Sequence, residues 1–258
     1  MMQSAEILGL AAVAAFAGAI NAVAGGGTLL TFPVLIFFGT PKIVANATST
    51  LALVVGTAGS IFSLRRQVGA VKPWLVRFVP VSVLGGLLGS VLLTRTGESV
   101  FAKLVPFLIL FATLLFLAQG AFRRFAGFGE KGPAHPQHRA VWVAVIFQFA
   151  VSAYGGYFGA GIGILMLASL GFLGLRDIHE MNALKNILSC LINVIAALWF
   201  IGAGLIDWPR AGVMSVGALA GYFLGAHFSQ RLPQLAVRRL VTVIGLTISA
   251  IMFWRQFR

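Results

Sequence analysis

The sequence predicts an all-α, polytopic membrane protein with 8–10 transmembrane segments in two homologous repeats that contain broken helices. Three observations support this prediction: a strongly apolar composition, apolar segments that recur along the chain, and an internal duplication. Of the 258 residues, 59% are hydrophobic and 10% are charged, and the mean hydropathy is +0.96. A typical soluble domain is about half apolar and about one-quarter charged. The composition therefore excludes a soluble protein.

The excess of basic residues is explained by the membrane. The net charge is +13, which in a soluble protein would suggest binding to nucleic acid. Here Lys and Arg lie mainly at the ends of apolar segments, where the positive-inside rule and anionic lipids account for them. We therefore expect the lipid bilayer as a partner and no nucleic acid. Residues 1–6 contain no Lys or Arg, so we expect the first apolar stretch to remain in the mature protein.

Apolar blocks follow one another from end to end. They cover residues 6–38, 43–64, 74–94, 100–120, 140–173, 178–203, 209–230 and 235–254. The first and the fifth are too long for one span of about 20 residues, and both contain a glycine-rich interruption. The most polar stretch, 121–139, is predicted to be a basic connecting loop. It divides the chain into a first transmembrane repeat, 1–120, and a second repeat, 140–258.

The interruption of the first block lies at residues 21–28, where three consecutive glycines precede Thr28, and Pro33 follows. In a helix interior, Gly costs roughly 1 kcal/mol and Pro about 3 kcal/mol relative to Ala, so this block is predicted to be a broken helix. Irregular backbone at membrane depth is tolerated only where it is packed in protein or lines a polar cavity. The N–H groups of a half-helix that begins near Thr28 would favour a bound anion. In secondary transporters, broken helices of this kind form the substrate site.

The two halves of the chain match without a gap when they are shifted by 136 residues, between about 21–95 and 157–231. In this frame Asn46 falls on Asn182, and Pro73 falls on Pro209. Because Asn and Pro are rare in apolar segments, their coincidence indicates an internal duplication. Duplicated halves are common in secondary transporters, with the substrate between them.

The direction of the two repeats depends on how the broken blocks cross the membrane. One crossing each gives eight spans and parallel repeats, and Lys and Arg then divide 11 to 8 between the two sides. Two crossings each give ten spans and inverted repeats, with a division of 13 to 6. The second division fits the positive-inside rule better and favours inverted repeats. Residues 28–38 would extend only about 16 Å, however, so a segment that enters and leaves on one side is an alternative.

Polar residues that follow each broken block are candidates for an anion site. Asn182, Lys185 and Asn186 share one helix face, and Asn46 and Ser49 occupy the corresponding region of the first half. Amides and hydroxyls donate hydrogen bonds to an oxyanion, and Lys185 adds a positive charge. The alternative for Lys185 is a side chain that reaches the membrane surface. Our candidate substrate-binding residues are Asn21, Gly25, Gly26, Gly27, Thr28, Asn46, Ser49, Tyr157, Gly161, Gly163, Asn182, Lys185 and Asn186.

We expect no metal, no cofactor and no catalytic residue. No block has His, Asp or Glu at metal-binding spacing, and no glycine-rich loop ends in the Lys-Ser/Thr pair of a nucleotide site. The chain has only six acidic residues, and most of them lie at segment ends. An enzyme would place several acids, histidines or a nucleophile at membrane depth.

The two glycine clusters and the Asn-Ala pairs that follow them resemble the sulfite exporter TauE/SafE family. The first-repeat signature is Asn21-Ala22-Val23-Ala24-Gly25-Gly26-Gly27, then Pro33 and Ala45-Asn46-Ala47-Thr48-Ser49; its counterpart is Gly155-Gly156-Tyr157-Phe158-Gly159-Ala160-Gly161, then Asn182-Ala183-Leu184-Lys185-Asn186. This sequence departs from the pattern at Gly161-Ile162-Gly163 and at Ser169, which stands where the first half has Pro33.

The resemblance covers nearly the whole chain and implies a secondary transporter that exports a small sulfur-containing anion, such as sulfite or an organosulfonate. It also implies the inner membrane of a bacterium. The alternatives are a passive anion channel, a membrane enzyme, or the scaffold subunit of a larger complex. No pattern in the sequence indicates an oligomeric state.

Overall fold

The computed structural model describes residues 2–23, 26–64, 68–125, 138–172, 178–228 and 234–256, which form α-helices and no strand. The predicted all-α fold is therefore confirmed. The helices of these ranges are α1 (Ser4–Val23), α2 (Thr28–Phe37), α3 (Lys42–Leu64), α4 (Val68–Arg95), α5 (Glu98–Phe125), α6 (His138–Tyr157), α7 (Ile162–Phe172), α8 (Ile178–Gly202), α9 (Trp208–Phe228) and α10 (Gln234–Gln256).

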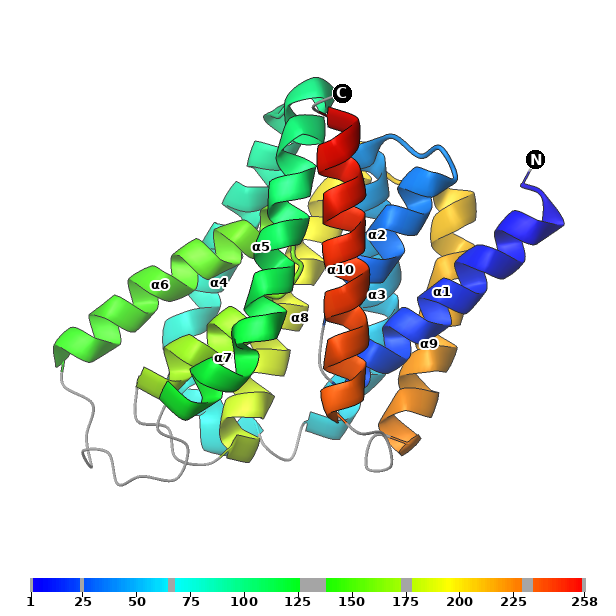
Figure 1. Cartoon of the computed structure of the whole chain (residues 1–258). Coiled ribbons are helices and arrows are strands. Elements are labelled where there is room, and N and C mark those ends of the chain that lie inside the picture. Colours follow the sequence, from blue (N-terminus) through cyan, green and yellow to red (C-terminus); the bar gives the residue numbers. More distant parts are fainter. Residues whose placement is uncertain are drawn as a thin grey trace.

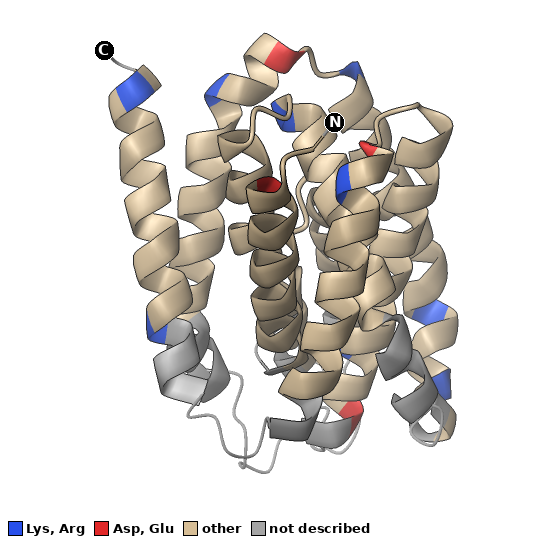
Figure 2. Ribbon diagram, turned by 90° about the vertical axis from the view of Figure 1, so that its right-hand side faces the viewer, with Lys and Arg blue, Asp and Glu red and all other residues tan. Residues whose placement is uncertain are grey.

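The apolar character of the helices fits a membrane environment. Among the described residues, four helical segments are long and apolar enough to cross a bilayer: Ser4–Ala22, Val71–Arg95, Glu98–Ala118 and Glu180–Gly202. Figure 2 shows that Lys, Arg, Asp and Glu gather toward the two ends of the helix bundle. The structure is that of an integral membrane protein.

The predicted breaks in the two long blocks are present. The first block forms α1 and α2, and the fifth block forms α6 and α7. Gly26, Gly159 and Gly161 at these breaks have φ values of 93°, 81° and 80°, a region that residues with a Cβ rarely adopt. Pro33 lies within α2 and not at the first break, so the replacement of this proline by Ser169 in the second half does not affect the position of the second break.

Each broken block folds into a helical hairpin. Glu6 near the start of α1 and Phe38 just after α2 both bind Arg210, so α2 turns back along α1. Residues from both α6 and α7, among them Val151 and Met166, share one buried apolar cluster. In Figure 1, α1 starts at the end of the bundle that carries both termini, whereas α6 starts at the opposite end.

The helix contacts of the two halves correspond to each other. Helix α1 packs on α9 and α6 packs on α4, while α3 packs on α9 and α8 packs on α4. Helices α5 and α10 lie side by side (Figure 1), and α3 contacts α8 between the halves. When α1 to α5 are exchanged with α6 to α10, the first contact of each of these two pairs becomes the second, and the contacts of α5 with α10 and of α3 with α8 map onto themselves.

Glycines permit the closest of these contacts. A Cβ at Gly221 of α9 would collide with the carbonyl group of Ala15 in α1, and a Cβ at Gly89 of α4 would collide with the carbonyl oxygen of Ala153 in α6. In a membrane, helices associate through close packing of small residues, since lipid provides no hydrophobic drive between them. These glycines therefore join the two halves.

Both ends of the predicted connecting loop, 121–139, are helical in the structure. Helix α5 continues to Phe125, and α6 begins at His138. Helical structure thus covers both ends of the predicted loop, because apolar and helix-forming residues at these ends extend the transmembrane segments. Residues 126–137 lie outside the described part of the chain.

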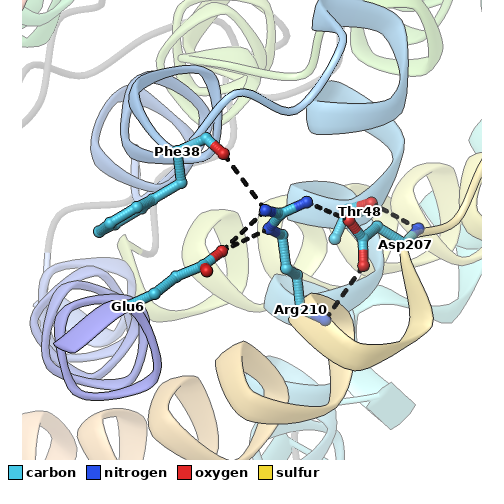
Figure 3. A network of polar contacts seen from close by, with 5 residues as sticks. All are labelled: Glu6, Phe38, Thr48, Asp207 and Arg210. Atoms are coloured by element: carbon cyan, nitrogen blue, oxygen red, sulfur yellow. Dashed lines mark hydrogen bonds and ion pairs between the residues drawn. The ribbon is translucent and has the colours of Figure 1, made fainter. Parts of the chain in front are cut away.

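An ion-paired cluster holds four helices together at the end of the bundle that carries the termini (Figure 3). Arg210 donates to Glu6 Oε1 at 2.8 Å, to Asp207 Oδ2 at 2.6 Å and to the carbonyl oxygen of Phe38 at 3.2 Å. The backbone N–H of Asp207 donates to Thr48 Oγ1 at 3.1 Å. The guanidinium therefore links the start of α1, the end of α2 and the start of α9, and the backbone of Asp207 connects this cluster to α3.

Candidate functional site

The two helix breaks meet at a small polar cavity of about 100 Å³. Its wall is formed by the ends of the hairpins, by one face each of α3 and α8, and by Phe116 of α5. A cavity of this size holds several water molecules or one small ion. It is lined by both halves of the chain, which places it at their interface.

The first turns of both short helices border this cavity. Gly26 and Thr28 contribute the start of α2, and Ile162 and Gly163 contribute the start of α7. The N–H groups of Leu29 and Leu30 in the first turn of α2 donate to the carbonyl oxygens of Gly26 and Gly27, so the helix dipole is the main reason why this end is favourable for an anion. Asn21 Oδ1 accepts a hydrogen bond of 3.0 Å from the backbone N–H of Gly27, which anchors the first break to α1.

Gly26 is required at its position. Its φ of 93° lies in the left-handed region, and an added Cβ would collide with the ring of Phe116. The aromatic ring thus packs directly against the bare backbone beside the cavity. A larger residue would have to displace Phe116 from the wall.

Helices α3 and α8 contribute equivalent positions to the cavity. Thr50 and Thr57 of α3 line it, as do Asn186, Ser189 and Asn193 of α8. Thr50 corresponds to Asn186 and Thr57 to Asn193 in the 136-residue frame. Residues separated by three, four and seven positions share one helix face. The cavity therefore receives hydroxyl and amide groups from matching faces of the two halves.

Among the described residues that line the cavity, Lys185 is the one with an ionisable side chain. Its Cδ lies 3.4 Å from the position that a Cβ on Gly163 would occupy, and its Nζ lies 3.5 Å from Asn182 Oδ1. Because Gly163 has no side chain, the side chain of Lys185 can lie beside the start of α7. No acidic residue is among the lining residues that the structure describes. The arrangement suits a bound anion.

Seven of the sequence-predicted residues line this cavity, and the others are placed elsewhere. The lining residues are Asn21, Gly26, Thr28, Gly161, Gly163, Lys185 and Asn186. Gly25 lies outside the described residues. Gly27, Asn46, Ser49, Tyr157 and Asn182 are not among the lining residues.

The predicted residues outside the lining make contacts that hold the breaks in place. Asn46 Nδ2 donates to the carbonyl oxygen of Tyr157 at 3.1 Å, at the end of α6. The hydroxyls of Ser49 and Thr31 are 2.6 Å apart, which ties α3 to α2. The hydroxyl of Tyr157 donates to Thr96 Oγ1 at 3.4 Å. Asn46 and Ser49 are 1% and 0% exposed, so they face protein.

Sequence reasoning did not select Thr57, Asn193 or Phe116. A signal for the first two was present, since each lies seven positions after a polar residue on the same helix face and the two coincide in the repeat frame. Phe116 comes from α5, which has no polar pattern, and only tertiary packing brings it to Gly26. In the described ranges, no group of three His, Cys, Asp or Glu residues could hold a metal ion.

An integral membrane bundle with two broken hairpins around a polar, anion-compatible cavity has the architecture of a membrane transporter. Residues 10–252 match the model of the sulfite exporter TauE/SafE family. The chain therefore belongs to the sulfite exporter TauE/SafE family, as its motifs predict.

Relatives from bacteria bear names that agree with this class. The chain is 30% identical over 240 residues to the "Probable membrane transporter protein" of Haemophilus influenzae, which covers 92% of this chain and 90% of that protein. It is 28% identical over 241 residues to the "Probable membrane transporter protein YfcA" of Escherichia coli, with coverage of 93% and 85%. No solved structure gives a significant match to the chain.

Proposed function

We propose that the protein is a secondary transporter that exports a small sulfur-containing anion, such as sulfite or a small organosulfonate, across the inner membrane. The observation that carries the proposal is the meeting of two half-helix N-termini and Lys185 at one cavity. Backbone N–H groups, amides and one ammonium group would replace the hydration shell of an oxyanion. The family name points to sulfite as the cargo.

The size of the cavity supports a small substrate. A volume of about 100 Å³ accommodates an inorganic oxyanion and excludes a large organic group. Hydrogen bonds to a charged group contribute about 1.5–3 kcal/mol each, so a few donors suffice for specific binding. We assign direct contacts to Thr28, Lys185 and Asn186, with Asn21 and Asn182 as orienting residues.

We further infer that the two halves are inverted repeats and that they move against each other around the cavity. The corresponding packing of α1 on α9 and α6 on α4 supports this inference. The opposite starting ends of α1 and α6 in Figure 1 also support it. In this arrangement, the end that carries 13 of the 19 Lys and Arg residues faces the cytoplasm. Both termini lie on the other side.

Flux of sulfite into proteoliposomes, with and without an imposed proton gradient, tests the proposal. The parent protein should transport sulfite in a saturable way. Lys185→Ala should raise the KM at least about tenfold, because an interaction with a charged group is lost. Lys185→Arg should retain more activity, since the positive charge remains. Lys72→Ala, which removes an exposed lysine from α4, is the matched control.

Other results would favour the alternative functions. Sulfite flux that does not saturate would favour a passive channel. A folded, reconstituted protein that moves no sulfite or sulfonate would contradict the proposed cargo. If Lys185→Ala and Lys72→Ala behave alike, the anion does not bind at this cavity.

A further inference from the structure

A groove lies between α2, α5 and α10, at the end of the bundle that carries both termini. It is larger than the polar cavity. Its volume is about 900 Å³, and most of its wall is apolar. Phe37, Ile251 and Met252 contribute to the apolar wall, whereas Lys42, Lys103 and Arg255 contribute three positive charges. The groove is separate from the polar cavity, since the two share no lining residue.

The basic residues lie near helix ends at the same end of the bundle. Lys42 is the first residue of α3, Lys103 lies in the second turn of α5, and Arg255 lies in the last turn of α10. Phe37 is 82% exposed and Ile251 is 49% exposed, so the apolar wall opens outward from the bundle. The basic rim is complementary to an anionic head group, and the apolar wall beside it can contact the apolar tail of the same amphiphile.

The three positive charges exceed the negative charge beside them. None of these side chains forms an ion pair with a carboxylate in the part of the chain that the structure describes. The neighbouring acid, Glu98, accepts hydrogen bonds of 2.6 and 3.1 Å from the backbone N–H groups of Lys42 and Ile43. Its charge thus stabilises the N-terminus of α3. The rim keeps a net positive charge.

The positive-inside rule does not explain this cluster. In the inverted arrangement, the end with both termini carries only six of the 19 Lys and Arg residues, and three of them line this one groove. The positive-inside rule concerns an excess of Lys and Arg on the cytoplasmic side, so it gives no reason for a basic cluster at the opposite end of the protein. Basic pockets between transmembrane helices can bind the head groups of anionic lipids.

We infer that this groove binds an anionic phospholipid. The phosphate lies among Lys42, Lys103 and Arg255, and an acyl chain follows the wall formed by Phe37, Ile251 and Met252. The lipid fills the space between α2 and the α5–α10 pair. Because α2 begins at the polar cavity, the bound lipid supports the helix that presents Thr28.

Native mass spectrometry of the purified full chain with phosphatidylglycerol tests this inference, with phosphatidylcholine of the same acyl chains as the comparison. The parent should retain one phosphatidylglycerol molecule at least tenfold more tightly than phosphatidylcholine. The combined variant Lys42→Gln, Lys103→Gln and Arg255→Gln should lose this preference. Each basic residue near an anionic surface contributes about 1 kcal/mol, or about fivefold.

Arg95→Gln is the matched control, because Arg95 is an exposed basic residue at the same end and does not line the groove. It should bind phosphatidylglycerol like the parent. The inference is overturned if the parent binds both lipids equally, if the triple variant keeps the preference, or if Arg95→Gln loses it as well. Displacement of the lipid by millimolar inorganic phosphate alone would also overturn it, since the acyl chain would then contribute nothing.

Discussion

At the residue scale, the one ammonium group among the described residues that line the cavity belongs to the second half of the chain. Lys185 corresponds to Ser49 in the 136-residue frame, yet the two side chains have different surroundings. Ser49 is buried against Thr31, whereas Lys185 borders the cavity. The ammonium group of Lys185 is therefore expected to compensate one negative charge on the proposed substrate.

A carboxylate introduced beside the cavity should oppose anion binding. Asn193 lines the cavity from α8, and Asp has nearly the same shape as Asn. We expect Asn193→Asp to reduce sulfite transport far more than Asn193→Ala, because like charges repel strongly in a partly buried site. Initial rates in proteoliposomes over a range of sulfite concentrations measure the difference. Equal losses in the two folded variants would show that no anion approaches Asn193.

At the element scale, helix packing depends on glycines whose backbone touches the next helix. Gly221 of α9 faces the carbonyl group of Ala15. At Gly212 of the same helix, no atom of another described helix lies within 4 Å of the place that a Cβ would occupy. The two glycines therefore provide a matched pair in one helix. They have the same intrinsic helix propensity and differ in whether a neighbouring helix lies against them.

Gly221→Ala should destabilise the protein, because α9 must move away from α1 to accommodate a methyl group. Gly212→Ala should leave the stability unchanged or raise it slightly, since Ala is favoured over Gly in helices by roughly 1 kcal/mol. Thermal melting in detergent provides the measurement. A melting temperature for Gly221→Ala equal to that of Gly212→Ala would contradict the tight contact of α1 with α9.

The Arg210 cluster makes a second prediction at this scale (Figure 3). Arg210→Gln removes the charge that Glu6 and Asp207 share and leaves two partly buried carboxylates close together. We expect a lower melting temperature, corresponding to roughly 1–3 kcal/mol. Glu6→Gln should cost less, because Asp207 still pairs with Arg210. An Arg210→Gln variant that melts with the parent would show that the cluster does not stabilise the helix ends.

At the scale of the whole molecule, the number of crossings determines which segments share a side of the membrane. In the inverted arrangement, residues 69 and 202 lie on opposite sides, and residues 97 and 202 lie on the same side. In the parallel arrangement of eight spans, the first pair shares a side and the second pair is separated. Three glycines in open surroundings, Gly69, Gly97 and Gly202, are suitable positions for a label.

Cysteine labelling distinguishes these arrangements. We would replace Cys190, the single cysteine of the chain, with Ser and introduce Gly69→Cys, Gly97→Cys or Gly202→Cys one at a time. In intact cells, a membrane-impermeant maleimide should label positions 97 and 202 but not position 69. Labelling of all three in permeabilised cells is the control. Labelling of position 97 without position 202 would contradict the inverted repeats.

Much of the architecture could be predicted because its signals are local. Apolar blocks of about 20 residues identify membrane helices, and residues 25–27 identify the first break through the helix cost of glycine. The loop 121–139 was predicted too long because α5 continues past Arg123 to Phe125. Long basic side chains are tolerated in the last turns of a membrane helix, since they can reach water from there. Composition marks a polar segment but does not show where a helix ends.

The sequence alone determined that this protein is a helical membrane protein with a break in its first and fifth apolar blocks, and that it resembles a family whose model it matches. Tertiary structure decided which polar residues face the cavity. Asn46, Ser49 and Asn186 look alike in sequence, yet Asn46 and Ser49 are enclosed by other helices while Asn186 borders open space. The local sequence specifies which face of a helix is polar. Whether that face borders a cavity or another helix depends on the neighbouring helices, which only the packed fold brings into place.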